Sequence, residues 1–269
     1  MRLFCLACEV LARPLYLSAA RSPHIVDIEL FRRGLHNDPA ELRARLQARI
    51  DEVSPKHSVL SCEHYDAIVM GYGLCGQAAA GLIARDIPIV IPRAHDCITL
   101  FLGGRETYRY QFDTFPGTYW YALDYVERDD GTGGSPRPQG GGSLALGATA
   151  AVEVDAVYEE YLRKYGKDNA DYLMEVMGAW QKHYKRAALI DMGIGDIAAV
   201  ESRAQADAER RGWAFERVAG DVVLIRRLLQ GEWHDGDGSD DFLVLQPGEQ
   251  VKMTYDDLVI GCGLAEVTK

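Results

Sequence analysis

The sequence has no apolar run long enough to cross a bilayer as a helix. Its N-terminal segment, MRLFCLACEVLARPL, is a poor signal peptide, because Glu9 and Arg13 interrupt the apolar run and no small-residue cleavage site follows cleanly. The chain also lacks a basic excess, since its formal net charge is −11, and this argues against a nucleic-acid-binding protein. We therefore expect a cytoplasmic protein that acts on neither membranes nor nucleic acids.

Several sequence motifs that would indicate a particular catalytic reaction are missing as well. There is no G-x-S-x-G nucleophile elbow and no P-loop lysine. The six cysteines have neither the spacing of a zinc ribbon nor that of a ferredoxin. In a cytoplasmic protein they are expected to be free thiols or metal ligands rather than a disulfide framework.

The chain does contain an alternation of apolar runs and helical segments over its first hundred residues. Short apolar runs occupy 3–7, 25–31, 66–70 and 87–91, with helices expected from Pro14, from Asp38 and over the small residues that end near Arg85. The last two runs have no polar alternation, which is typical of parallel strands buried on both faces. A parallel sheet covered by helices is the predicted architecture.

A second α/β series follows a stretch rich in glycine and proline. Two helical segments are expected at VYEEYLRKYG and DNADYLMEVMGAWQKHY, followed by strands at 187–192, 213–218 and 242–246. The chain is long enough for two small domains with a core each. We predict an α/β fold of two Rossmann-like lobes with mostly parallel sheets and a cleft between them: a first lobe over 1–128, a loop or linker over 129–150, and helices plus a second lobe over 151–269.

The segment GYGLCG at 71–76 matches the G-x-G-x-x-G pattern of dinucleotide-binding loops. It follows an expected strand and precedes an expected helix, as such a loop should. However, the acid expected at the end of the next strand is missing, and the loop is third in the series rather than first. NAD is therefore an unlikely cofactor, and the loop has a second interpretation through Cys75.

Cysteines and histidines follow four of the expected strands. The carboxyl ends of parallel strands open on the same edge of a sheet, so these side chains are predicted to meet in one crevice. Nearby helix N-termini would favour thiolates there. Thiolates and imidazoles suit zinc or an iron–sulfur cluster, and three cysteines would leave a coordination position open. The predicted metal ligands are Cys8, Cys75, Cys97, His95 and His36.

Other residues of these loops are candidates for holding a small molecule. Glycines near Cys75 would let a bulky centre or ligand approach the backbone. Arg93 is the best placed of three arginines that could bind a carboxylate or phosphate. The predicted substrate-binding residues are Gly71, Tyr72, Gly73, Gly76, Arg93 and Asp96. The bland alternative is that the cysteines are small buried hydrophobes, which is the better interpretation for Cys5.

The succession of GYGLCG, IPRAHDCITLFLG and PGTYW resembles the family catalogued as domain of unknown function 1638. CEVL, GLH, DNADYLMEVMGAW and IDMGIGD extend the resemblance over the whole chain. Members are often associated with corrinoid-dependent methyltransferases and folate one-carbon enzymes. By association, the resemblance implies a role in one-carbon or methyl metabolism, with a corrinoid protein or methyltransferase as partner. Together with the thiolate-rich site predicted from the residues, this gives the expectation of metal-dependent chemistry on a small molecule. The alternative is a non-catalytic cofactor-binding or accessory protein of such a system. The family pattern matches at Cys8, His36, Cys75, His95, Asp96 and Cys97.

Overall fold

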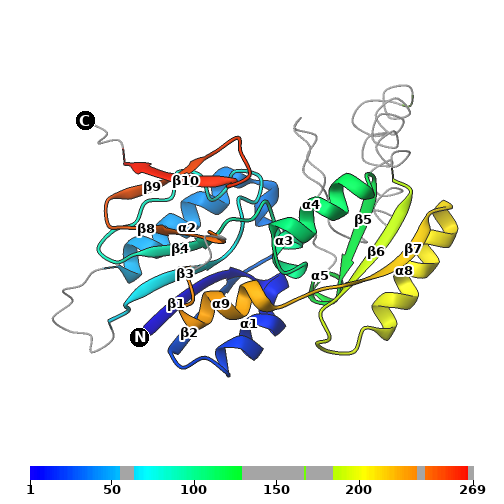
Figure 1. Ribbon diagram of the computed structural model, residues 1–269, viewed down its shortest axis with the longest axis horizontal. Coiled ribbons are helices and arrows are strands. Elements are labelled where there is room, and N and C mark those ends of the chain that lie inside the picture. The colour runs from blue at the N-terminus through cyan, green and yellow to red at the C-terminus, as the bar shows by residue number, and fades with distance from the viewer. Residues whose placement is uncertain (55–63, 129–166, 168–183, 235–239, 266–269) are drawn as a thin grey trace. The chain divides into compact units, whose positions relative to one another are not determined.

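The computed structural model shows a mixed α/β fold with mostly parallel sheets (Figure 1). It describes residues 1–54, 64–128, 167, 184–234 and 240–265. The glycine- and proline-rich stretch at 129–150 and nearly all of the two helical segments expected after it lie outside the described residues.

The larger sheet has five strands in the order β2-β1-β3-β4-β8. The neighbouring pairs among the first four are parallel, as the uninterrupted apolar runs predict, whereas β8 pairs with β4 in the antiparallel direction. Every residue of β3 and β4 is buried. The strands are β1 (Arg2–Cys8), β2 (Ile25–Phe31), β3 (Ala67–Gly71), β4 (Ile89–Pro92) and β8 (Phe242–Leu245).

Helices cover both faces of this sheet (Figure 1). A Cβ on Gly71 would meet both Ala7 and Leu15 of α1 (Ala12–Ala19), and α1 packs against α9 (Val223–Gln230). Arg49 of α2 (Pro39–Val53) lies over the Phe4 ring. Residues 4 and 7 of a strand point to opposite faces, so α1 and α2 cover different sides.

The start of α2 follows from its first residues. The Asp38 carboxylate accepts a hydrogen bond of 3.1 Å from the Glu41 backbone N–H, and Pro39 has no N–H to satisfy in the first turn. Three shorter elements complete this region: the 3-10 turns η1 (Glu9–Leu11) and η2 (Leu35–Asn37), and helix α3 (Cys97–Phe101).

The prediction of a helix directly after GYGLCG is wrong. Residues 72–85 form turns and one isolated bridge, from Ile83 to Gln250. The backbone N–H groups of Gly81 and Ala84 donate to Val251 and Glu249, in or next to the antiparallel pair β9 (Glu249–Met253) and β10 (Ile260–Leu264). Backbone groups that would have closed a helix are used instead to attach this segment to β9.

The smaller sheet consists of three parallel strands in the order β5-β6-β7. They are β5 (Thr118–Ala122), β6 (Arg186–Asp191) and β7 (Ala214–Ala219). The core beside them includes Tyr119, Tyr121 and Leu189, which pack with side chains of α5 (Leu123–Glu127) and α8 (Ala198–Arg211). Gly212 ends α8 with a left-handed φ of 67°.

Contacts between Cα atoms divide the chain into two compact units. The first comprises Met1–Tyr108 and Gly220–Lys269, and the second comprises Arg109–Ala219. These bounds differ from the predicted lobes, because the C-terminal part of the chain supplies β8 and α9 to the first unit. Helix α4 (Arg105–Thr114) contains the first boundary. Within the described residues, no helix is both long and apolar enough to cross a membrane.

Candidate functional site at the carboxyl edge of the larger sheet

Three neighbouring strands bring the candidate residues to one edge. Cys8 ends β1, Tyr72 and Cys75 follow β3, and Cys97 follows β4. The register pairs Ala7 with Gly71, so Cys8 and Tyr72 are at adjoining positions. We call this region, made of Cys8, Tyr72, Cys75, Asp96 and Cys97, the thiol edge.

The glycine loop is attached to the segment that follows β4. The N–H groups of Leu74 and Cys75 donate to the carbonyls of Ala94 and His95 over 2.8 and 2.9 Å. A Cβ on Gly73 would stand 2.6 Å from the Ala94 oxygen, closer than real Cβ atoms come. Position 73 must be glycine so that two backbone segments can meet there.

Gly71 likewise allows a close approach between two backbone segments, because a Cβ added there would lie 2.5 Å from the Ala7 Cβ. The space beside both glycines is therefore filled by the protein, not left open for a ligand as the sequence suggested. Gly76 has a φ of 63°, which suits glycine, and a Cβ there would only touch Pro39 and the His36 carbonyl.

Cys75 has a left-handed backbone with a φ of 45°, which is rare for a residue other than glycine. Its hydrogen bond to His95 and the glycines around it hold this conformation. Strained residues of this kind concentrate at functional sites. The fold thus holds Cys75 close to the start of α3, where Cys97 lies.

The thiols of the thiol edge influence one another electrostatically. Burial is the largest influence and raises the pKa of both Cys75 and Cys97. The negative charges of Asp96 and Cys8 raise both pKa values further, and that of Cys75 also acts on Cys97. The expectation that helix N-termini favour thiolates is not met in the free protein, because burial and like charge outweigh them. A bound cation would reverse this balance.

Asp96 caps α3. Its carboxylate accepts hydrogen bonds of 2.9 and 3.3 Å from the N–H groups of Ile98 and Thr99. Burial nevertheless raises the pKa of Asp96 to about 6, although these bonds and one from the Tyr108 hydroxyl act to lower it. Nothing in the sequence marks Tyr108 as a neighbour of Asp96. It is one of two tyrosines in α4, and only the fold brings it to Asp96.

The two histidines occupy different surroundings. His95 is exposed, and its ring stacks on Tyr108 with a centroid distance of 5.3 Å. His36 is half-buried in η2, and its carbonyl borders Gly76. Burial, followed by the charge of Arg33, lowers the pKa of His36, so its ring is neutral at neutral pH.

The chemical types of these side chains suit a soft metal, because three thiols and a carboxylate lie at the same sheet edge. Across the described residues, however, no three His, Cys, Asp or Glu side chains are already arranged to hold a metal ion. A metal bound here therefore requires the thiol side chains to turn toward it.

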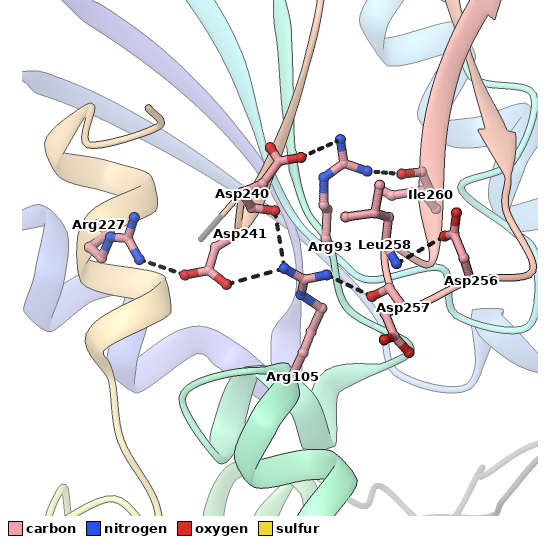
Figure 2. Close-up of polar contacts among 9 residues, drawn as sticks. All are labelled: Arg93, Arg105, Arg227, Asp240, Asp241, Asp256, Asp257, Leu258 and Ile260. Carbon is pink, nitrogen blue, oxygen red and sulfur yellow. Dashed lines mark hydrogen bonds and ion pairs between the residues drawn. The ribbon is translucent and has the colours of Figure 1, made fainter. Parts of the chain in front are cut away.

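Arg93 lies at the same sheet edge, but its guanidinium is bound to the C-terminal part of the chain (Figure 2). It donates to the Ile260 carbonyl, and its Nη2 lies 3.3 Å from the Asp240 carboxylate. Arg105 donates to the Asp257 carbonyl over 2.6 Å. These contacts attach the segment before β8 and the turn before β10 to the edge of the sheet, and they occupy two of the three guanidinium nitrogens of Arg93.

The remaining cysteines lie elsewhere. Cys5 is fully buried within β1, as expected of a small hydrophobe, and burial raises its pKa to about 12. Cys262 is exposed in β10. Cys62 lies outside the described residues.

Fold and site together define an α/β protein with a thiol-rich strand edge. Residues 30–229 match the family described as "Protein of unknown function (DUF1638)". The match covers most of the chain, and the protein belongs to this family. Comparison with curated proteins and with solved structures found no match.

Proposed function

We propose that the protein binds a soft metal centre, zinc or an iron–sulfur cluster, through Cys8, Cys75 and Cys97. The observation that supports this most is the convergence of three thiols from three neighbouring strand ends, next to Asp96.

A bound cation would favour the ionised thiols of the thiol edge. The charged groups that act on Cys75 and Cys97 are thiols and a carboxylate, all negative when ionised. The metal would bind the deprotonated thiols and release their protons, so its affinity should rise with pH. Three thiolates leave a coordination position for a small molecule.

We further propose, from the family resemblance, that this small molecule belongs to one-carbon or methyl metabolism and that the protein is a cytoplasmic enzyme linked to corrinoid-dependent methyl transfer. A corrinoid protein or methyltransferase is the partner that this proposal implies. Two Rossmann-like lobes with a cleft between them remain the predicted finer architecture.

Purification without oxygen, followed by elemental analysis and an absorption spectrum, tests the proposal. We expect near-stoichiometric zinc, or iron with the absorption of a cluster. Cys75→Ala should lose the metal with little change in the circular dichroism spectrum, because the substitution is small and lies in a loop.

Cys262→Ala is the matched control, since Cys262 is exposed in β10 and is no part of the thiol edge. It should retain the metal of the wild type. Full metal content in Cys75→Ala, or a wild-type protein that takes up no zinc, cobalt or iron, would contradict the proposal.

A further inference from the structure

The Tyr72 hydroxyl is buried at the thiol edge without a hydrogen-bond partner among the described residues. The side chain is only 3% exposed. Tyr72 directly follows β3, at the position adjoining Cys8, and Cys75 lies on the same loop. The hydroxyl is thus a polar group placed where the proposed function needs a ligand.

A hydroxyl buried without a partner is costly. Phenylalanine would avoid this desolvation cost while filling almost the same volume. Buried tyrosines normally have a partner. Tyr121 of β5 is an example in this chain, because its hydroxyl donates to the Asp207 carboxylate over 3.1 Å.

The surroundings of Tyr72 keep its hydroxyl a donor. Burial is the largest influence that raises its pKa, and the negative charges of Cys8 and Cys75 raise it further. The phenol is therefore protonated at any physiological pH and has one hydrogen to donate.

We infer that Tyr72 donates a hydrogen bond to an acceptor atom of the small molecule that occupies the thiol edge. The ligand then carries an oxygen or nitrogen acceptor next to the metal, as a small anion, a carboxylate or a carbonyl compound does. This inference rests on the proposed function, because the metal centre supplies the position at which such a molecule binds.

The first test uses the metal-free protein and compares Tyr72→Phe with Tyr121→Phe in urea. Tyr72→Phe should leave the unfolding midpoint unchanged or raise it, because the substitution removes an unpaired buried hydroxyl. Tyr121→Phe should lower the midpoint, because it removes the hydrogen bond to Asp207 Oδ2 and leaves Arg210 to donate to the other carboxylate oxygen. A midpoint that falls as far in Tyr72→Phe as in Tyr121→Phe would overturn the inference, since the hydroxyl would then have a structural partner.

The second test uses cobalt(II), which takes the same ligands as zinc and reports its surroundings by absorption, with azide as the anion probe. Tyr72→Phe should bind cobalt as tightly as the wild type but bind azide about tenfold more weakly, as loss of about 1.4 kcal/mol predicts. Equal azide affinity in the two proteins, or a wild-type cobalt spectrum that azide does not change, overturns the inference and leaves metal binding intact. A wild-type protein that takes up no cobalt, zinc or iron instead overturns the proposed function, and the inference with it.

Discussion

Asp96 is subject to opposing influences on its carboxyl group. Burial raises its pKa from 3.8 to about 6, against the hydrogen bonds from the first turn of α3 and from Tyr108. A carboxyl group with a raised pKa is better tolerated by the folded protein when protonated. Its contribution to stability is fully present below pH 3.8 and is lost as pH rises through about 6.

Asp96→Asn should therefore gain stability over the wild type as pH rises. Asparagine caps a helix about as well as aspartate and does not ionise. One pKa unit corresponds to about 1.4 kcal/mol, so a shift from 3.8 to about 6 corresponds to roughly 3 kcal/mol between acidic and neutral pH. Urea unfolding of the metal-free proteins across this range measures the difference, and a pH-independent difference would contradict the prediction.

The residues of the site were partly predictable from sequence. The position of Cys8, Cys75 and Cys97 at one sheet edge is predictable, because each comes after an apolar run and parallel strands open on one edge. The hydrogen bond of Tyr108 to Asp96 and that of Arg93 to Ile260 could not be predicted. Both depend on contacts between parts of the chain that are distant in sequence. The direction in which the thiol pKa values shift could not be predicted without the structure either, because it depends on how deeply the thiols are buried.

At the scale of elements, the glycine loop depends on its fit against the segment after β4. Gly73→Ala should destabilise the protein by about 1–3 kcal/mol, because the added methyl group meets backbone atoms that have no room to move. The Cβ would lie 2.6 Å from the Ala94 oxygen and 2.9 Å from the Asp96 nitrogen. Metal affinity should fall as well, because the loop carries Cys75.

Gly104→Ala is the matched control for Gly73→Ala. Nothing lies within 4 Å of a Cβ at position 104, and its backbone φ is not left-handed. Its urea midpoint should remain close to that of the wild type. Equal midpoints for both variants would show that the loop does not need the close approach at position 73.

Sequence predicted most strands of both sheets but not the segment after the glycine loop. Small residues at 78–80 favour a helix locally. The left-handed backbone of Gln77 and Gly81 and the hydrogen bonds to β9 prevent one. Likewise, the apolar run at 242–246 predicts a strand but not that it pairs with β4 in the antiparallel direction. The pairing joins one segment that precedes the second unit in the sequence to another that follows it.

At the scale of the whole molecule, the first unit needs both ends of the chain. A chain that stops at Ala219 should fail to form the larger sheet, because it lacks β8, α9 and the carbonyl bound by Arg93. Hydrogen exchange measured by mass spectrometry should show unprotected amides in β1 and β3. Co-expression of residues 220–269 should restore protection, and native protection in the shortened chain alone would contradict the prediction.

The discontinuity of the first unit also has a consequence for biosynthesis. Cys97 leaves the ribosome roughly 150 residues before Leu245, an interval of about 7–30 s at ordinary rates of translation. Until then β4 has no β8 beside it, and the thiols are borne by an incomplete sheet. The thiols of the nascent chain are exposed to oxidation and to premature capture of a metal during this interval. Under the proposed function, insertion of the metal centre is therefore expected to follow release of the finished polypeptide.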